Sequence, residues 1–229
     1  MGIHNEETFI EHQRSLAPKL DLTTRFSVSD VNYVSGIDLS YWDANGKEYA
    51  VCCISTVSFK TKELIEIKSC TDRVEIPYIP GCLSFRELPI ILKTYKQIAI
   101  APDIAIFDGN GYLHPRHMGI ASHASFYLNI PTIGVAKSYF KIGGTEYAPP
   151  GNTVGSYEDI VINGEIYGRV LRTRKNIKPI FVSVGNWIDI DTSTEVVLSL
   201  IGDESRQPIP TRIADIESRK QRDALKRTL

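Results

Sequence analysis

The chain has 229 residues, 42 % of them hydrophobic and 23 % charged, and its 26 basic side chains nearly balance its 27 acidic ones. This composition excludes collagen-like, disordered and coiled-coil proteins, and the length suits a single domain spanning residues 1–229. The balanced total does not indicate a nucleic-acid or membrane partner, so the local distribution of charge has to be considered.

Hydrophobic periodicity predicts one helix and then three strands in the first third of the chain. The helix is expected over residues 5–18, and the strands over residues 31–41, 48–59 and 63–70. The Asn45-Gly46 turn and a short polar link before the third strand favour an antiparallel meander.

Helical and strand-like segments alternate in the remainder of the chain. Helices are predicted over residues 83–99, 116–128, 195–201 and 211–226. Strands are predicted over residues 103–107, 132–135 and 180–184, with a hairpin over residues 161–175 around Asn163-Gly164. Helix starts are indicated by two capping boxes and one cap, namely Ser84 with Glu87, Thr192 with Glu195, and Thr211.

This order of elements predicts a mixed α/β fold, with a central sheet flanked by helices. Strands that follow helices need crossover connections and therefore run parallel in the sheet. The same order occurs in the ribonuclease H-like fold, where carboxylates on the first and fourth strands face each other, and Asp38 and Asp108 occupy comparable positions. Sites in such sheets lie outside the carboxyl ends of the parallel strands, where the loop after Asp108 begins.

Asp38 and Asp108 are the leading candidates for chemistry. Asp38 lies among mostly apolar or small strand residues, where a buried carboxylate is costly unless it is paired or binds a metal. The alternatives are an exposed aspartate on a hydrated face for Asp38 and an ordinary Asp-Gly turn for Asp108. His114 and Arg116 lie a few residues beyond Asp108 and add a proton carrier and a cation.

Glu87, Lys137 and Tyr78 each have an ordinary and a functional interpretation. Glu87 fits a capping box, which is its ordinary explanation. Lys137 follows a predicted parallel strand and is either a solvated residue or a phosphate partner in the same crevice. Tyr78 is held between Pro77 and Pro80, and it either packs onto the protein or forms a rigid aromatic blade that stacks on or wedges between bases.

Carboxylates without cysteine ligands favour Mg²⁺ over zinc. Mg²⁺ is held by one or two carboxylates together with water and substrate phosphate, a composition that favours phosphodiester hydrolysis. The spacing of His114, His117 and His123 matches no usual zinc pattern. Two basic segments would then follow a phosphate backbone, although a solvated face is the commoner interpretation. They are residues 206–229 and the group Arg169, Arg172, Arg174, Lys175 and Lys178.

Cysteine usage and the lack of targeting segments indicate an intracellular protein. The four cysteines form no C-x-x-C pair, so we expect buried thiols in a reducing compartment, at Cys52, Cys53, Cys70 and Cys82. The sequence has no secretory segment, and no apolar run approaches the roughly 18 residues of a membrane span. We therefore expect a cytoplasmic protein with no membrane partner.

Six stretches, spread over nearly the whole chain, together resemble the endonuclease V family. They are residues 36–40 (GIDLS), 77–87 (PYIPGCLSFRE), 103–116 (DIAIFDGNGYLHPR), 119–123 (GIASH), 131–138 (PTIGVAKS) and 210–214 (PTRIA). The resemblance is specific because six stretches occur in the family's order and two of them, residues 77–87 and 103–116, are long.

The resemblance implies a ribonuclease H-like DNA-repair enzyme that recognises deoxyinosine, the deamination product of deoxyadenosine. It would hydrolyse the second phosphodiester bond on the 3′ side of the lesion with Mg²⁺, for which Mn²⁺ could substitute. Carried over by position, Asp38 and Asp108 would be the metal ligands, and Glu87 a third catalytic acid in place of its capping interpretation. Lys137 would contact phosphate near the scissile bond.

The resemblance also implies how the lesion is held. Tyr78 would belong to a wedge that separates the strands. The flipped base would enter a pocket whose predicted lining is Gly81, Leu83, Gly109, His114 and Ile120. Asp215 occupies a position where some family members have histidine and others aspartate, so it would ligate metal or orient water.

Three alternatives stay open from the sequence. Family members differ in preferring DNA or RNA, so an endoribonuclease for inosine-containing RNA is the main one. A nucleotide-binding ATPase or sugar kinase of related fold is disfavoured, because the chain lacks internal repeats and a P-loop. A non-catalytic lesion-binding protein is disfavoured by the three acidic residues. We expect the protein to act as a monomer.

Overall fold

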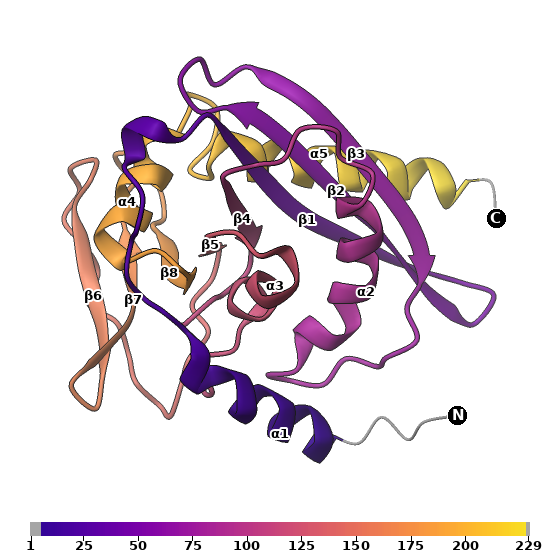
Figure 1. Ribbon diagram of the computed structural model, residues 1–229, viewed down its shortest axis with the longest axis horizontal. Helices are drawn as coiled ribbons and strands as arrows, with labels where there is room; N and C mark the ends of the chain where they lie inside the picture. Colours follow the sequence, from indigo (N-terminus) through magenta and orange to yellow (C-terminus); the bar gives the residue numbers. More distant parts are fainter. Residues whose placement is uncertain (1–5, 228–229) are drawn as a thin grey trace.

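The computed structural model describes residues 6–227, which build one eight-stranded sheet covered by helices (Figure 1). The strand order is β3-β2-β1-β4-β5-β8-β7-β6. The pairs β1–β4 and β4–β5 are parallel, and the other neighbouring pairs are antiparallel. The predicted mixed α/β sheet of ribonuclease H-like order is therefore confirmed.

The first three strands form the predicted antiparallel meander. They are β1 (Tyr33–Ala44), β2 (Lys47–Ser58) and β3 (Leu64–Arg73). Asn45 and Gly46 have φ values of 51° and 70°, the left-handed conformation that a two-residue hairpin turn requires. Cys52 and Cys53 point to opposite faces of the sheet and are buried, as expected, whereas Cys70 is only partly buried.

The remaining strands are shorter and arranged around the parallel centre of the sheet. They are β4 (Ile104–Asp108), β5 (Thr132–Ala136), β6 (Tyr157–Ile162), β7 (Glu165–Leu171) and β8 (Ile180–Asn186). The hairpin turn at Asn163-Gly164 is confirmed, although its first strand begins four residues before the predicted start and its second ends at Leu171.

Helices pack on both faces of the sheet (Figure 1). On one face lie α2 (Leu83–Tyr95) and α3 (Ile120–Leu128), and on the other lie α4 (Ile190–Ser199) and α5 (Ile209–Leu225). Ala105 and Phe107 of β4 pack toward α2 and α3, whereas Ile104 and Ile106 pack toward α4 and α5. This strand is apolar on both sides because it is buried on both sides.

Helix α1 (Glu6–Leu16) confirms the predicted N-terminal helix, of which Asn5 lies outside the described residues. Its Phe9 ring stacks on Phe85 of α2, with ring centroids 4.1 Å apart. Two short 3₁₀ helices follow, η1 (Ala17–Lys19) and η2 (Val28–Asp30). Within residues 6–227, no helix is long and apolar enough to cross a membrane.

The predicted helix starts at Thr192 and Thr211 are wrong. Asp189 caps α4, because its carboxylate accepts a hydrogen bond of 2.7 Å from the amide of Thr192. Thr211 lies inside the first turn of α5 and donates its hydroxyl proton to the carbonyl of Pro208. The helices thus begin at Ile190 and Ile209, and α3 begins at Ile120 instead of residue 116.

The capping box at the start of α2 is also wrong. Cys82 precedes the helix without a side-chain cap, and Ser84 lies inside the helix with its hydroxyl 2.7 Å from Nδ1 of His123. Glu87 accepts a hydrogen bond from the Tyr41 hydroxyl on β1. Both side chains of the predicted box therefore bind tertiary partners. The helix ends at Tyr95, four residues before the predicted end.

Candidate functional site

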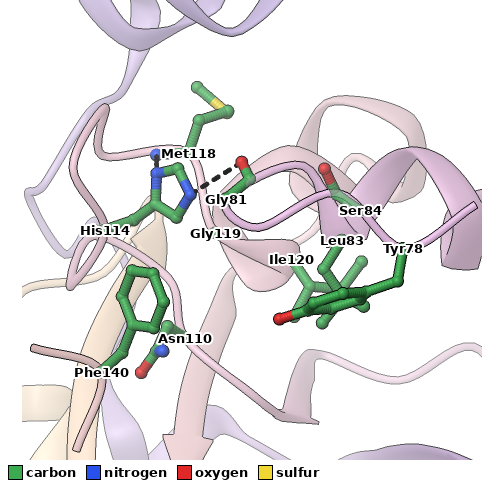
Figure 2. A pocket seen from close by; sticks show the side chains of 10 residues that line it. All are labelled: Tyr78, Gly81, Leu83, Ser84, Asn110, His114, Met118, Gly119, Ile120 and Phe140. Atoms are coloured by element: carbon green, nitrogen blue, oxygen red, sulfur yellow. Dashed lines mark hydrogen bonds between the residues drawn. The ribbon is translucent and has the colours of Figure 1, made fainter. Parts of the chain in front are cut away.

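A pocket opens between the loop that precedes α2 and the loop that follows β4 (Figure 2). Four of the five residues predicted to line a lesion pocket do line it, together with Tyr78. They are Gly81, Leu83, His114 and Ile120. Gly109 does not line the pocket but lies next to Ile120, since a Cβ added to Gly109 would lie 2.7 Å from the Ile120 side chain.

Two kinds of surface face each other across the pocket. Figure 2 shows Leu83, Ile120 and the exposed Tyr78 ring on one side, and the His114 and Phe140 rings on the other. The rings of His114 and Phe140 are nearly parallel, with 6° between their planes and 6.1 Å between their centroids. Two walls of this kind suit a flat heterocycle.

Five lining residues were not predicted to line the pocket. They are Ser84, Asn110, Met118, Gly119 and Phe140. Asn110 lies between the two glycines of the loop after Asp108, a position that could have indicated it from the sequence. Phe140 comes from the loop after β5, and no spacing or motif indicated that this loop returns to the pocket.

Partly buried hydrogen bonds hold the pocket wall around Gly81 in place. The carbonyl of Gly81 accepts a hydrogen bond of 2.7 Å from Arg116 and lies 3.0 Å from Nε2 of His114. Arg116 also donates to the Gln13 side chain on α1, so it holds structure together and is not a free cation. Burial and the nearby charge of Arg116 lower the pKa of His114 to about 4, which leaves this imidazole neutral near pH 7.

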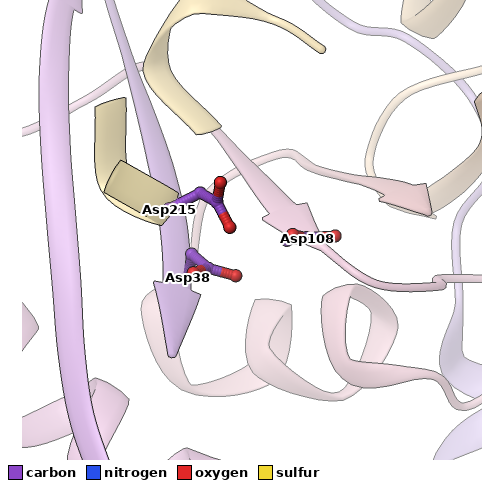
Figure 3. Close-up of side chains that lie close together, drawn as sticks. All are labelled: Asp38, Asp108 and Asp215. Atoms are coloured by element: carbon purple, nitrogen blue, oxygen red, sulfur yellow. The ribbon is translucent and has the colours of Figure 1, made fainter. Parts of the chain in front are cut away.

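The register of β1 and β4 explains how two carboxylates meet next to this pocket. Ile37 lies opposite Phe107 in the parallel pair, so the next residues are Asp38 and Asp108, on the face that α5 covers. Asp215 reaches the same place from α5, and ligand atoms of the three carboxylates all lie within 4.8 Å of one another (Figure 3). The predicted meeting of Asp38 and Asp108 is therefore present, and a third carboxylate completes the group.

Asp215 is held by cations. Lys137 extends from the end of β5, with its Nζ 2.5 Å from Asp108 Oδ2 and 3.0 Å from Asp215 Oδ1. Arg212 and Arg219 of α5 contact Asp215 at 3.2 Å and 2.6 Å. Asp215 is only 2 % exposed, whereas the side chains of Arg212 and Arg219 are 39 % and 53 % exposed, so solvent is excluded from only one end of these contacts.

Burial and neighbouring charges shift the pKa values of Asp38 and Asp215 in opposite directions. Burial, reinforced by the charge of Asp108, raises the pKa of Asp38 well above its usual range. Burial would also raise the pKa of Asp215, but hydrogen bonds and charges from Lys137 and Arg219 hold it below its usual value. Asp38 and Asp108 repel each other, and a bound cation would neutralise this repulsion.

The donor set fits a hard divalent cation. The group found within residues 6–227 offers three carboxylates and no histidine or cysteine, which suits oxygen-binding cations better than zinc. His114, His117 and His123 do not belong to it. The carboxylates of Asp38, Asp108 and Asp215 would hold the ion.

Glu87 lies on α2 and outside this compact group. Its side chain is buried, and its Oε1 accepts a hydrogen bond of 2.6 Å from the Tyr41 hydroxyl. Burial, together with the charge of Asp108, raises the pKa of Glu87 to about 7. The hydrogen bond from Tyr41 and the charge of Arg86 oppose this rise. The catalytic role of Glu87 stays a prediction.

Much of the predicted basic surface binds the protein itself. Arg169 is 4 % exposed and forms ion pairs with Asp159 and Asp191, so its predicted place in a phosphate-binding strip is wrong. Arg206 donates hydrogen bonds to backbone carbonyls of neighbouring loops. At the end of α5, Lys226 and Arg227 are exposed.

His123, which contacts Ser84 behind the pocket, makes stability depend on pH. Burial lowers the pKa of His123 to about 3, whereas an unfolded chain has the ordinary value of about 6.5. The unfolded state therefore binds a proton first, and acidification from pH 7 to pH 5 should cost about 2 kcal/mol of stability through this residue.

We expect His123→Asn to remove the loss of stability that protonation of His123 causes between pH 7 and pH 5. The asparagine amide can keep the contact with Ser84. Denaturant unfolding of both proteins at pH 7 and pH 5 measures the difference. An unchanged difference between the two pH values in the variant would mean that His123 is not neutral in the folded state.

Comparison with known proteins agrees with this geometry. The model of the family described as Endonuclease V matches residues 14–216. The endonuclease V of Bacillus thuringiensis subsp. konkukian is 54 % identical over 219 residues, which cover 96 % of this chain and 93 % of that protein. The crystal structure of endonuclease V from Bacillus subtilis has a TM-score of 0.96 and 45 % identity, covering 99 % of this chain and 96 % of that one.

A more distant structure contains nucleic acid. It is endonuclease V of Ciona intestinalis in complex with a 24mer DNA containing an inosine followed by a ribo-adenosine. It has a TM-score of 0.84 and 27 % identity to this chain, and the match covers 96 % of this chain and 98 % of that one.

Proposed function

Because the chain belongs to the endonuclease V family, we propose that it is a DNA-repair endonuclease that recognises deoxyinosine and cuts the strand at the second phosphodiester bond on the 3′ side. The observation that carries the proposal is the position of the Asp38, Asp108 and Asp215 group at the end of the same strand, β4, whose following loop lines the pocket. An extruded base and a phosphate of the same strand can thus be bound together.

We propose Mg²⁺ as the cofactor, with Mn²⁺ able to substitute. When bound, the ion would supply an activated water and neutralise charge on the phosphate. The protein positions the carboxylates that hold it: β1 carries Asp38, β4 carries Asp108 and α5 carries Asp215. Because these elements are packed against one another, the ligand positions are largely preformed.

Lys137 and Glu87 have complementary roles in this proposal. Burial would lower the pKa of Lys137, but its contacts with Asp108 and Asp215 raise it, so the ammonium is charged at neutral pH and can bind phosphate at the end of β5. Glu87, with a pKa raised to about 7, can accept or donate a proton near neutrality. Its hydrogen bond from Tyr41 fixes the carboxyl.

The pocket supplies recognition. A base that leaves the duplex would lie between the aliphatic wall of Leu83 and Ile120 and the rings of His114 and Phe140. Neutral His114 keeps positive charge out of the pocket. Tyr78, 63 % exposed at the rim, would fill the gap left in the duplex.

We expect Tyr78→Ala to reduce the preference for deoxyinosine over undamaged DNA by roughly 5- to 150-fold, because stacking on one base contributes about 1 to 3 kcal/mol. Competition binding with matched duplexes, with and without the lesion, measures the ratio. Tyr127→Ala, which removes another half-exposed tyrosine from α3, is the control. Equal discrimination by Tyr78→Ala and the wild-type protein would show that the Tyr78 ring does not contact the bases.

An endoribonuclease acting on inosine-containing RNA is the second candidate. The observation in its favour is that the Ciona intestinalis relative was crystallised with an inosine followed by a ribonucleotide. Cleavage of matched single strands, one DNA and one RNA, under identical conditions tests the choice. Faster cleavage of the DNA strand supports the repair function, and cleavage confined to the RNA strand would replace it with the second candidate.

A further inference from the structure

A buried serine lies directly behind one of the candidate cation ligands. Ser218 Oγ donates a hydrogen bond of 2.9 Å to Asp38 Oδ2, and Ser218 is fully buried. Ser218 belongs to α5, one helical turn after Asp215. The same helix therefore provides one carboxylate of the group and a hydroxyl that contacts another.

The hydroxyl has one proton and three neighbours that compete for it. Besides Asp38 Oδ2, these are the Ser40 hydroxyl at 2.9 Å and the backbone carbonyl of Asp215 at 3.1 Å. When a bound cation keeps Asp38 ionised, its carboxylate is the strongest acceptor of the three, so the Ser218 proton goes to Asp38. Ser218 then has a lone pair free for the proton of Ser40, which gives a donor chain from Ser40 through Ser218 to Asp38.

This chain restricts how the Asp38 carboxylate can turn. One of its oxygens is held from the helix side, so the other remains for a cation shared with Asp108 and Asp215. Without the hydroxyl, repulsion from Asp108 and the loss of a buried hydrogen bond would both favour rotation of the Asp38 side chain. The helix α5, which carries Ser218, packs directly on the strand β1, which carries Asp38.

We propose that Ser218 is a positioning residue for the cation site, whose hydroxyl fixes the carboxylate of Asp38 for binding jointly with Asp108 and Asp215. The inference rests on the proposed function, because it assumes that these carboxylates bind a divalent ion. Groups that orient a metal ligand typically change metal affinity by 10- to 100-fold when they are removed. Ser218→Ala should therefore weaken cation binding by roughly that factor.

A second buried serine provides a matched control. Ser55 Oγ donates to the carbonyl of Pro210 at 2.6 Å, so it also joins the sheet to α5, but its hydroxyl binds no carboxylate of residues 6–227. Ser55 is fully buried, like Ser218. A purely structural role for both hydroxyls predicts that Ser55→Ala and Ser218→Ala behave alike. A positioning role predicts that they differ in cation binding.

The test is direct binding of Mn²⁺ by isothermal titration calorimetry, without nucleic acid, to the wild-type protein and the two variants. We expect Ser218→Ala to weaken Mn²⁺ binding roughly 10- to 100-fold and Ser55→Ala to stay within about twofold of wild type. If Ser218→Ala does not fold, Ser218→Cys keeps nearly the same shape with a weaker donor and should still weaken binding several-fold.

Two outcomes would overturn the inference, and they are distinguishable. If the folded Ser218 variant binds Mn²⁺ as tightly as wild type, the serine only packs α5 onto the sheet and the cation site stands without it. If neither wild type nor Ser55→Ala binds Mn²⁺, the proposed cation site itself is wrong. A selective loss in the Ser218 variant supports the inference.

Discussion

Replacement of Asp108 by asparagine is expected to lower strand cleavage by at least roughly 10²- to 10³-fold while binding of deoxyinosine DNA is largely retained. The substitution keeps the size of the side chain but removes its charge, which leaves Asp38 and Asp215 to hold a divalent ion. The ion serves the chemical step, whereas affinity comes from the pocket and from contacts with phosphates. Cleavage rates at saturating enzyme and binding in the absence of Mg²⁺ measure the two effects separately.

Asp103 provides the control for this substitution, because it lies just before the opposite end of β4. Its carboxylate accepts hydrogen bonds from the amides of Asn32 and Tyr33, which an asparagine oxygen can also accept. Asp103→Asn should therefore cleave at the wild-type rate. Undiminished cleavage by Asp108→Asn would show that this carboxylate does not hold the catalytic ion.

Gly36→Ala is expected to destabilise the protein by at least about 3 kcal/mol, because it places a methyl group against the backbone of α5. A Cβ at this position would lie 2.1 Å from the carbonyl carbon of Pro210 and 2.2 Å from the nitrogen of Thr211. Helix α5 would have to move away from β1, and Asp215 would move with it. Cleavage should therefore fall together with stability.

Denaturant unfolding and cleavage assays at low temperature, where the variant is folded, measure both consequences. Gly151→Ala is the control, since its methyl group would meet only the side chain of Ser156 at 3.2 Å. Stability of Gly36→Ala within about 1 kcal/mol of wild type would mean that α5 does not depend on close contact with β1.

The strands could be predicted from the sequence because local pattern and tertiary role agree there. Ile104 to Phe107 is apolar at every position and is buried on both faces, and Asn45-Gly46 and Asn163-Gly164 form the turns that they indicate. The start of α2 could not be predicted in the same way. Ser84 and Glu87 have the spacing of a cap, but His123 and Tyr41, which are distant in the sequence, bind them instead.

The residues of the candidate site also differ in whether the sequence could predict them. Asp38 and Asp108 follow from strand order, because parallel neighbours bring their carboxyl ends together. Asp215 lies on a helix whose sequence is rich in charge, so composition could not distinguish it from its neighbours, and its assignment depended on family resemblance. Phe140 and Ser218 were missed because only the folded chain brings them to the pocket and to Asp38.

The measurement that tests the central claim most directly is cleavage of an end-labelled duplex with one deoxyinosine, with Mg²⁺ or with EDTA. We expect a product that ends one nucleotide beyond the lesion on its 3′ side, formed with Mg²⁺ and absent with EDTA or from an undamaged duplex. No Mg²⁺-dependent cut in this duplex or in its RNA counterpart would contradict the account, because the carboxylate group would then lack the proposed chemistry.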